Sequence, residues 1–543
     1  MNPANQAIID WLSQADHYGQ TVKQVEKIET HISTVFLTGE FAYKLKKRVN
    51  FGFLDFTPLA SRKTYCEMEV SLNRRTAPQL YLGVIALYQH PQHYNQISFE
   101  PQPGLVVADY LVKMRQFDPQ NVLSRYVLKQ ALTDHQTNDL AEAIADLHQQ
   151  AEPIKAGDFL GSPACVIQPM LDNFPSLLAL LTSQRPLITN AQLDLTALQN
   201  RLRQLENWTR TQHTLLAPMI EQRQQQGHVR ACHGDLHLDN ITLINNKPVL
   251  FDGIEFNDQF RWIDTLSDLA FLLIDLDFRQ QPGLAAKILN RYLQLNGDYA
   301  GLVLLRFYQT YRALVRAKIT GLRYEQLPPE SLEAQDSLTT MLAYIDLAEH
   351  YAYLHHTQPT LYIMQGVSGS GKSYYADQIH RQTGAIVVGS DRERKRLYGI
   401  HSQHRVTEAE KRRLYSTEMN QATYQRLLES CQSALQAGLS VVADATFLQA
   451  KSRQNFIALA QSFGLPYLVV CIEPDAKQAS ELIKQRHQRN DDPSDANVEI
   501  MQRQLTQFEA PSTAENHICL TMQTALPDLS TLQKNIPLPI TNE

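Results

Sequence analysis

The chain has 543 residues, of which 43% are hydrophobic and 20% charged, and its net charge is −6. A chain of this length is too long to fold around one hydrophobic core, so two to four globular domains are expected. Its composition excludes a disordered or fibrous chain. The weak negative charge provides no general attraction to nucleic acid or anionic membranes. The six cysteines include no CxxC pair, which argues against a metal cluster or a disulfide framework and favours a cytoplasmic protein.

No targeting or membrane segment is expected. Residues 1–18 are polar and mixed in charge, so they do not predict a signal peptide. The most apolar run, 266–278, is interrupted by Ser267, Asp268, Asp275 and Asp277. It therefore predicts a buried helix and not a membrane span.

The first part of the chain predicts a helix at 5–17, then a β-hairpin of residues 34–37 and 41–45 around a Thr-Gly-Glu turn. Lys44 and Lys46 lie two apart on the second strand and so share one face. Taken alone, they suit a solvated pair on an edge strand. The motifs further along favour the alternative, in which Lys44 reaches the phosphates of ATP.

A helix predicted at 60–76 carries Glu67 and Glu69. Either glutamate could pair with the strand lysine, or each could make only a surface contact one helical turn away. Strands are predicted at 80–87 and 105–114, and Met114 stands where a linker between lobes would offer its backbone to adenine. A helix at 137–150, capped by Thr133 or Asp134, and helical segments within 175–226 follow.

The central stretch reads His233-Gly-Asp-Leu-His-Leu-Asp-Asn240 and is followed by Phe251-Asp-Gly253. Strands at 241–244 and 248–251, joined by the tight turn of Asn245 and Asn246, predict a hairpin that lets Asn240 and Asp252 address one metal ion.

Phosphoryl transfer needs neutralised phosphate charge and a positioned acceptor hydroxyl more than covalent help from the protein. Asp235 is therefore the candidate base for the hydroxyl proton. Asn240 and Asp252 are the candidate ligands of Mg²⁺, and His233 is expected to hold the loop together rather than perform chemistry.

Residues 252–277 contain many carboxylates and a single basic residue, Arg261. An acidic pocket would attract a cationic acceptor, whereas carboxylates that bond backbone and helix ends would have a structural role. We favour the structural interpretation. The seven carboxylates are Asp252, Glu255, Asp258, Asp264, Asp268, Asp275 and Asp277.

These motifs, together with Asp264-Thr-Leu-Ser-Asp268-Leu-Ala, resemble the aminoglycoside phosphotransferase and choline kinase branch of the protein-kinase-like superfamily. The resemblance covers about residues 25–345 and implies a bilobal α+β domain that uses ATP and Mg²⁺. It implies an amino-terminal lobe at 1–115, with Lys44 and Glu69 as its ATP-binding pair, and a carboxy-terminal lobe with the catalytic loop at 116–350. No Gly-x-Gly-x-x-Gly loop precedes Lys44, which departs from protein kinases.

A linker at 351–359 precedes a second nucleotide motif, Gly366-Val-Ser-Gly-Ser-Gly-Lys372-Ser373. It follows the short apolar strand 361–364 and opens an amphipathic helix, which is the context that a P-loop requires. Gly366, Gly369 and Gly371 let backbone N–H groups face the phosphates. Lys372 would bridge the β- and γ-phosphates, and Ser373 would ligate Mg²⁺.

Two further apolar runs in this domain end in acids, at Asp391 and Asp444. In an open parallel sheet the carboxyl ends of strands face the ligand, so Asp391 is the candidate base and Asp444 the candidate metal-linked acid. Helix capping is the alternative for each. Arg486 and Arg489, three apart in a helical pattern, could close on the phosphates or lie on a solvated face.

The P-loop with these acids resembles the gluconate-kinase, zeta-toxin and polynucleotide-kinase-like group over about residues 360–525, and implies an α/β P-loop domain at 360–543 with a parallel sheet. The order of the two domains resembles a bacterial fusion family described as bifunctional aminoglycoside phosphotransferase/ATP-binding proteins. The family's substrate does not follow from this resemblance.

The leading hypothesis is an ATP- and Mg²⁺-dependent phosphotransferase with two sites, each acting on a hydroxyl of a small molecule that the sequence does not identify. The alternative is a regulatory ATP-binding protein in which one domain gates the other. A nucleic-acid end kinase ranks third, through a basic groove of Arg392, Arg394, Lys395, Arg396 and Lys411-Arg-Arg413. The oligomeric state cannot be predicted.

Overall fold

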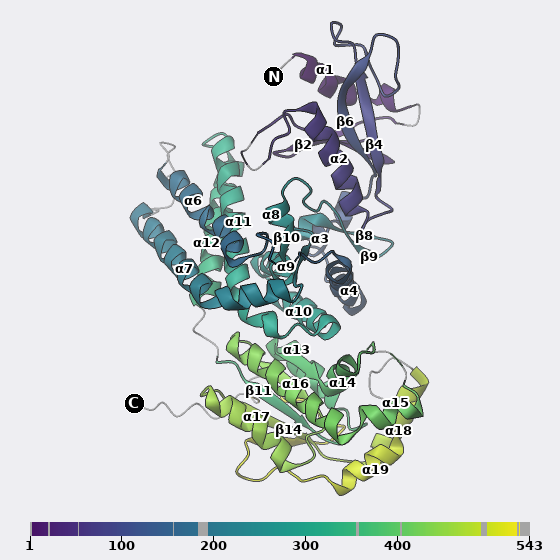
Figure 1. The fold of residues 1–543 in the computed structure, drawn as a ribbon, viewed down its shortest axis with the longest axis vertical. Coiled ribbons are helices and arrows are strands. Elements are labelled where there is room, and N and C mark those ends of the chain that lie inside the picture. Colours follow the sequence, from purple (N-terminus) through teal and green to yellow (C-terminus); the bar gives the residue numbers. More distant parts are fainter. Residues whose placement is uncertain are drawn as a thin grey trace. The chain divides into compact units, whose positions relative to one another are not determined.

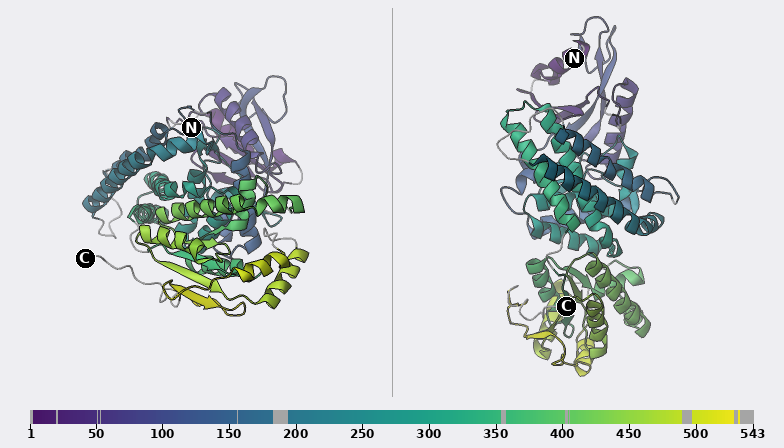
Figure 2. Two further views of the ribbon diagram at one scale, coloured as in Figure 1. Left: turned by 60° about the horizontal axis from the view of Figure 1, so that its bottom comes forward. Right: turned by 90° about the vertical axis from the view of Figure 1, so that its left-hand side faces the viewer.

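Two large sheets of opposite kinds organise the chain in the computed structural model, an antiparallel sheet of six strands and a parallel sheet of five. The structure describes residues 3–19, 22–50, 52, 54–155, 157–182, 194–353, 358–401, 404, 406–489, 497–528 and 532. The chain divides into two units, residues 1–178 with 209–275 and residues 179–208 with 276–543. Figures 1 and 2 show their elements.

The antiparallel sheet belongs to the first unit and has the strand order β1-β2-β3-β6-β4-β5. Its strands are β1 (Glu26–Glu29), β2 (Ser33–Leu37), β3 (Phe41–Lys46), β4 (Tyr81–Gln89), β5 (Ile97–Ser98) and β6 (Val106–Arg115). Side chains alternate along a strand, so Tyr43 and Leu45 face α1 (Pro3–Leu12), while Lys44 and Lys46 face α2 (Leu59–Asn73). Because β3 pairs with β2 and β6, the edge-strand interpretation of the lysines is wrong.

The rest of the chain up to residue 278 is mainly helical and carries the central stretch, and its residues 179–208 and 276–278 belong to the second unit. Its elements are η1 (Ala15–Tyr18), η2 (Pro119–Asn121), α3 (Leu123–Tyr126), α4 (Asp134–Gln150), α5 (Pro163–Leu171), α6 (Asn173–Thr182), α7 (Leu195–Gln225), β7 (Val229–Ala231), η3 (Leu238–Asn240), β8 (Ile241–Ile244), β9 (Lys247–Leu250), α8 (Asp258–Arg261), β10 (Trp262–Asp264) and α9 (Thr265–Phe278). Thr133 caps α4, its side chain accepting from Gln136 N while Gln136 reaches back to Thr133 N, which confirms one of the two expected caps.

The expected hairpin of β8 and β9 is confirmed, with Ile241 opposite Leu250 in its register. Asn245 and Asn246 in its turn have φ values of 51° and 63°. Positive φ at both central residues defines the two-residue turn whose twist matches that of the flanking strands, and asparagine tolerates it well.

Two apolar helical stretches of the described chain bear on whether it could span a membrane. The run 266–278 forms most of α9, and its leucines at 266, 269, 272 and 276 are fully buried, as expected of a core helix. Pro163–Thr182, which contains α5 and α6, is long and apolar enough to cross a membrane by length and composition. That test is weak evidence, because the core helices of soluble proteins also pass it.

The second unit begins with helices and ends in the parallel sheet. Its helices before the sheet are α10 (Pro282–Asn296), η4 (Ala300–Leu304), α11 (Leu305–Gln326) and α12 (Leu332–Tyr353). The sheet has the order β12-β13-β11-β14-β15, and every neighbouring pair in it is parallel. This arrangement is the α/β P-loop fold that the sequence predicts.

Helices alternate with the strands of this sheet. The elements are β11 (Leu361–Gln365), α13 (Lys372–Thr383), β12 (Ile386–Gly389), α14 (Ser390–Tyr398), α15 (Glu408–Leu414), α16 (Thr417–Gln436), β13 (Val441–Asp444), α17 (Ala450–Ser462), β14 (Tyr467–Ile472), α18 (Ala476–Arg489), α19 (Val498–Thr506) and β15 (His517–Leu520). Tyr362 and Met364 of β11 join Tyr375 and Ile379 of α13 in one buried cluster, so α13 covers one face of the sheet.

Candidate active sites

The lysine and glutamate expected to bind ATP meet beneath the antiparallel sheet. Lys44 Nζ donates to Glu69 Oε1 at 2.9 Å and also pairs with Asp252. Glu67 is exposed and pairs instead with Lys63 on the same helix, at 3.7 Å. The structure therefore brings together Lys44, Glu69 and Asp252, and it separates Glu67 from them.

A second lysine and a further carboxylate extend this group. Lys46 Nζ donates to Glu69 Oε2 at 2.6 Å and also to Glu255, and both side chains of this second pair are buried. Burial alone would raise the pKa of the Glu69 carboxyl, but Lys44 and Lys46 outweigh it and lower that pKa to about 2. Glu69 is thus a charged bridge between the two lysines.

Asp235 and Asn240 of the central stretch are in direct contact. Asn240 Nδ2 donates to the Asp235 backbone oxygen at 2.9 Å and to Asp235 Oδ2 at 3.0 Å. The amide therefore fixes the carboxylate that is expected to receive the hydroxyl proton. The Oδ1 atom of Asn240 is then the one that could ligate a metal, since carboxylate and amide oxygens are the ligands that Mg²⁺ prefers.

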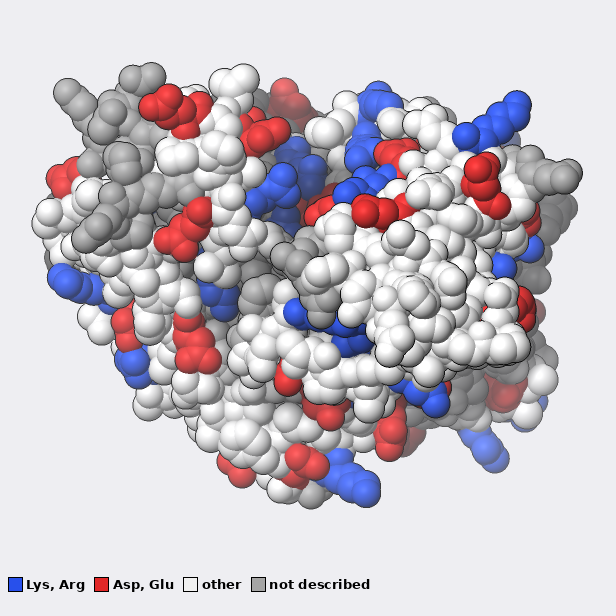
Figure 3. Space-filling model, turned by 90° about the horizontal axis from the view of Figure 1, so that it is seen from above, with Lys and Arg blue, Asp and Glu red and all other residues white. Residues whose placement is uncertain are grey.

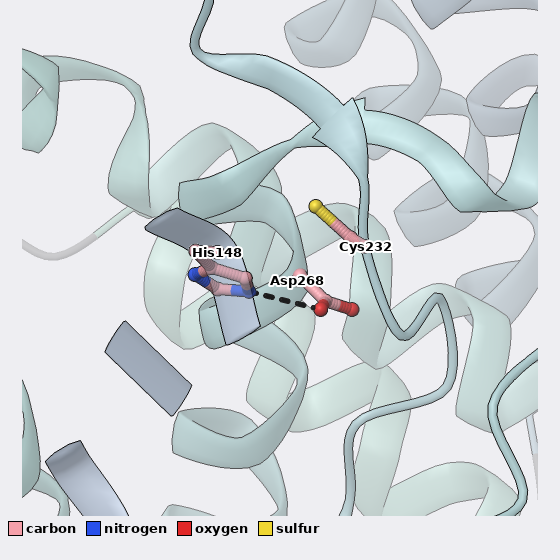
Figure 4. A group of neighbouring side chains, drawn as sticks. All are labelled: His148, Cys232 and Asp268. Atoms are coloured by element: carbon pink, nitrogen blue, oxygen red, sulfur yellow. Dashed lines mark hydrogen bonds and ion pairs between the residues drawn. The ribbon is translucent and has the colours of Figure 1, made fainter. Parts of the chain in front are cut away.

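A buried aspartate holds the beginning of this loop. Asp268 of α9 accepts from His233 N at 3.0 Å and from Gly234 N at 2.9 Å. His148 Nε2 lies 3.1 Å from the same carboxylate, and Cys232 lies beside it (Figure 4). These three side chains could be taken for metal ligands, but the carboxylate already serves two backbone donors and the histidine, so we assign them the structural task of fixing the loop.

His233 ties the loop to the strand that leads to Asp252. Its Nε2 lies 2.9 Å from the backbone oxygen of Phe251, and burial lowers the pKa of its imidazole. A neutral imidazole can donate Nε2–H to that carbonyl oxygen. This contact suits a side chain that holds the two halves of the site in register.

Asp252 occupies a strained backbone position at the site. Its φ is 61°, a left-handed conformation that is costly for any residue except glycine, with asparagine and aspartate the most tolerant. Its N–H donates to the Tyr81 hydroxyl at 3.1 Å, and Gly253 N donates to Asn73 Oδ1 at 2.8 Å. These contacts from β4 and α2 hold the Asp252 carboxylate, which remains 40% exposed, toward Lys44.

All seven carboxylates between residues 252 and 277 have partners within the described fold. Besides the pairs already given for Asp252, Glu255 and Asp268, the partners are Arg261 for Asp258, Arg223 for Asp264, Leu238 N for Asp275 and the Tyr351 hydroxyl for Asp277. The structural interpretation of these acids is therefore confirmed. Their partners account for these acids without a cationic acceptor.

The P-loop of the second unit has the backbone that a phosphate cradle needs. Gly366, Gly369 and Gly371 all have positive φ, at 155°, 80° and 84°. A Cβ at Gly369 would lie 2.6 Å from the Ala479 backbone oxygen, so glycine is required where α18 packs against the loop. Lys372 Nζ donates to Val367 O at 2.8 Å and so folds back over the same loop.

Ser373 and Asp444, the two residues expected to ligate Mg²⁺ at the P-loop, are in direct contact. Ser373 Oγ donates to Asp444 Oδ2 at 2.7 Å, between the start of α13 and the end of β13. Desolvation raises the pKa of the Asp444 carboxyl, although Lys372 and the Ser373 hydrogen bond lower it. Hydroxyl and carboxylate oxygens at the mouth of a P-loop suit Mg²⁺, so the residues present fit the metal that the motif implies.

Asp391 lies in the first turn of α14, at the carboxyl end of β12. It is close enough to Asp444 to raise the pKa of that carboxyl electrostatically. The structure therefore places both expected acids at the same edge of the sheet as the P-loop. The last turns of α18 contain Arg486 and Arg489, whose side chains lie outside the described residues.

Part of the basic run behind the nucleic-acid hypothesis is turned inward. Arg394 donates to Leu414 O and Asn420, Lys395 donates to His404 O, and both side chains are buried. Arg396 pairs with the buried Glu393. Arg412 and Arg413 of α15 are exposed, so a basic surface of fewer residues stays a prediction. The face drawn in Figure 3, on which basic and acidic side chains are interspersed, is seen from above and does not test it.

Three features of the P-loop site escaped the sequence. Gly366 N donates to Thr446 O at 3.1 Å, which ties the P-loop to the segment after β13. Phe447 in that segment has a φ of 43°, a marked strain for an aromatic residue. Gln504 of α19 accepts from Ser368 N at 2.7 Å and so supports the P-loop from behind. The signal that marks this region is a positive φ at a non-glycine residue. Backbone angles of this kind cannot be read from a sequence.

Comparison with known proteins matches both halves. Residues 108–305 match the phosphotransferase enzyme family, and residues 361–511 match the family described as AAA domain. Among solved structures, a choline/ethanolamine kinase family protein from Mesorhizobium loti is 14% identical, covering 64% of this chain and 98% of that chain with a TM-score of 0.36. A gluconokinase from Sinorhizobium meliloti is 19% identical, covering 33% and 90% with a TM-score of 0.23.

Among curated proteins, an uncharacterized protein of Mycobacterium tuberculosis is 30% identical over 422 residues, which are 77% of this chain and 78% of the relative. A protein of Mycobacterium bovis, also described as uncharacterized, matches with the same identity and coverage. The chain therefore belongs to the family of these mycobacterial proteins and joins a phosphotransferase domain to a P-loop kinase-like domain.

Proposed function

We propose that the protein is a phosphotransferase that uses ATP and Mg²⁺ at two sites, each of which transfers the γ-phosphoryl group to a hydroxyl of a small molecule. One observation carries the proposal: each site sets a lysine close to a carboxylate that can hold Mg²⁺. Lys44 pairs with Asp252, and Lys372 acts electrostatically on Asp444. A lysine and a metal ligand together neutralise the phosphate oxygens as charge develops on them.

At the first site, Asp235 accepts the proton of the acceptor hydroxyl. The hydroxyl oxygen bonds to the γ-phosphorus as the bond between that phosphorus and the departing ADP oxygen breaks. Asn240 and Asp252 hold Mg²⁺, which neutralises phosphate charge when bound. Lys44, oriented by Glu69, contacts the α- and β-phosphates. The hydrogen bond from Asn240 to Asp235 supports this assignment, because it links the proposed base to a proposed metal ligand.

At the second site, the backbone of the P-loop and Lys372 bind the β- and γ-phosphates. Ser373 and Asp444 hold Mg²⁺, and Asp391 receives the proton of the second acceptor. The contact between Ser373 and Asp444 supports this arrangement, since one ion can bind both oxygens.

The division into domains is part of this proposal. We assign residues 1–115 and 116–350 to the two lobes of the first site, 351–359 to a linker, and 360–543 to the P-loop domain. The end of α12 at Tyr353 and the start of β11 at Leu361 support a linker between them. Part of that linker, 354–357, lies outside the described residues.

A regulatory role for the first site is the second candidate. The connection between β1 and β2 consists of residues 30–32, and Thr30 N donates to Ser33 O at 2.9 Å to close it. A turn this short leaves no glycine-rich loop over the phosphates. In this alternative the first site binds nucleotide without turnover and gates the P-loop site.

Single-site variants separate the two functions. Asp235→Ala and Lys372→Ala are each prepared with the other site intact, checked for folding by circular dichroism, and assayed for ATP turnover in a metabolite screen for phosphorylated products. We expect each variant to lose one set of products and keep the other. Loss of all transfer with either single change would rule out two independent kinases. Full activity in both variants would rule out chemistry at these sites.

A further inference from the structure

The lysine and carboxylate side chains under the antiparallel sheet form a chain of alternating charge. Asp252 pairs with Lys44, Lys44 with Glu69, Glu69 with Lys46, and Lys46 with Glu255. Each oxygen of Glu69 serves one lysine, and each lysine reaches one carboxylate of the segment 252–255. Two independent contacts therefore join β3 and α2 to that segment.

The two ends of this chain differ in exposure. Asp252 is 40% exposed and Lys44 10%, whereas Lys46 is fully buried and Glu255 is 4% exposed. The exposed end can reach nucleotide and metal. The buried end cannot, so Lys46 and Glu255 do not touch the reacting groups.

Burial makes this second pair costly, and that cost calls for an explanation. Taking two ions out of water is repaid only with good geometry, and apolar residues of similar volume would often stabilise a fold as well or better. Lys46 meets two carboxylates, and its ammonium also lies 5.0 Å from the centre of the Phe56 ring. The pair thus fixes a definite position of its segment, which an apolar contact would define less sharply.

We propose that Lys46 and Glu255 are positioning residues, which lock the segment after β9 so that Asp252 presents its carboxylate to Mg²⁺ in the nucleotide-bound site. This proposal rests on the proposed function of the first site. Asp252 has a strained backbone, so its position must be imposed by its surroundings, and Glu255 lies three residues beyond it. Lys46 also holds Glu69, the partner of Lys44. It therefore influences both Lys44 and Asp252, the two charged groups that face the phosphates.

The test measures Mn²⁺ binding by electron paramagnetic resonance in the presence of a non-hydrolysable ATP analogue. The full chain carries Lys372→Ala, which removes the P-loop site from the measurement. Lys46→Met and Glu255→Gln are each expected to weaken Mn²⁺ binding about 10- to 100-fold, the usual effect of losing an outer partner of a metal ligand. The double variant should bind Mn²⁺ about as weakly as Lys46→Met alone, because Glu255 acts through Lys46.

A second buried pair of the same lobe supplies the matched control. Arg62 Nε donates to Asp109 Oδ1 at 2.7 Å, and their side chains are only 2% and 3% exposed. No described contact joins this pair directly to the segment 252–255, although Arg62 also donates to the backbone oxygen of Phe56, whose ring lies near Lys46 and Phe256. The control is therefore Asp109→Asn, which keeps Arg62 in place; it should lower the melting temperature and leave Mn²⁺ affinity unchanged.

The outcomes separate failure of the inference from failure of the proposed function. Asp252→Asn in the same background should abolish Mn²⁺ binding; if it does not, or if the parent binds none, the proposed site itself is wrong. If Asp252→Asn abolishes binding while Lys46→Met and Glu255→Gln bind normally, only the positioning role is wrong. Equal weakening by Asp109→Asn would also overturn it.

Folding is checked by circular dichroism. If the single variants do not fold, Lys46→Met combined with Glu255→Leu removes both buried charges and supplies the measurement. A combined variant that does not fold, beside a folded control variant, would assign Lys46 and Glu255 to stability alone and overturn the proposal.

Discussion

At the scale of single residues, both candidate sites place charged groups where the surrounding protein shifts their protonation. Glu69 is held ionised by two lysines, so its pKa is lowered despite burial. Asp444 shows the opposite balance, since desolvation raises its pKa more than Lys372 and Ser373 lower it. The fold satisfies the charge of the first carboxylate, whereas ionisation of the second is unfavourable in the fold, and a cation at the proposed site would relieve that cost.

Asp444→Asn should therefore stabilise the protein while it disables the P-loop site. The folded pKa of Asp444 lies above the ordinary value for aspartate, so ionisation of this carboxyl opposes folding, and the cost grows as pH rises through that interval. The variant should melt at a higher temperature than wild type at neutral pH, and the difference should vanish as pH falls below the ordinary aspartate range. Differential scanning calorimetry over a pH series measures it.

The matched control is Asp377→Asn on α13, a 49% exposed carboxylate paired with Arg381. It should change the melting temperature little at any pH. In an Asp252→Asn background, which removes nucleotide binding at the first site, Asp444→Asn should also lose Mg²⁺-dependent binding of ATP. If Asp444→Asn melts below wild type at neutral pH, the raised pKa assigned to Asp444 is wrong.

At the scale of elements, the hairpin of β8 and β9 positions the first site. Its strands begin just after Asn240 and end two residues before Asp252, and Phe251 N donates to Asn240 O at 3.0 Å. The open end of the hairpin thus carries both proposed metal ligands. The turn at its closed end sets the register that brings them together.

Replacing both Asn245 and Asn246 by alanine should destabilise this hairpin. Left-handed backbone costs alanine roughly 1–2 kcal/mol per residue, whereas asparagine bears it more easily. The double alanine variant should lower the melting temperature of the unit that contains the hairpin, and it should weaken nucleotide binding at the first site. Asn246→Gly is the control, since it keeps the positive φ and should be at least as stable as wild type. An alanine pair as stable as the glycine variant would show that the turn does not set the register.

The elements that sequence reasoning found are those with clear local patterns. The hairpin turn, the P-loop and β11 have their expected positions, because turn chemistry, glycine spacing and an unbroken apolar run each leave a local signature. β1 was missed because its Glu-Lys-Ile-Glu sequence is exposed throughout and shows no alternation. The role of Lys46 was missed because its partner Glu255 lies 209 residues away, and local spacing says nothing of such pairs.

At the scale of the whole molecule, two sites predict two bound nucleotides per chain. Calorimetric titration with Mg²⁺ and a non-hydrolysable ATP analogue should give a stoichiometry near two for the wild-type chain. Lys372→Ala and Asp252→Asn should each reduce it to one, because the first removes a positive charge that neutralises phosphate at the P-loop site and the second removes a ligand of the Mg²⁺ that does so at the first site. Lys63→Ala, which changes an exposed lysine of α2, is the control and should leave it at two.

A wild-type stoichiometry of one would contradict the prediction, and the variant that abolishes it would show which site is real. The sequence identified both nucleotide motifs but no acceptor. Acceptor specificity comes from side chains that converge from many elements, and no short motif records that convergence.

The partnered carboxylates of residues 252–277 have a consequence for how an acceptor arrives at the first site. Clusters of unpaired acids speed the capture of cations over long distances, and salt suppresses that effect. Here Lys44, Lys46, Arg223 and Arg261 offset the charge of four of these acids, whereas backbone N–H groups and the Tyr351 hydroxyl hold the others without cancelling their charge. A positively charged acceptor should therefore still associate faster at low ionic strength, and its selection would depend on contacts made after arrival.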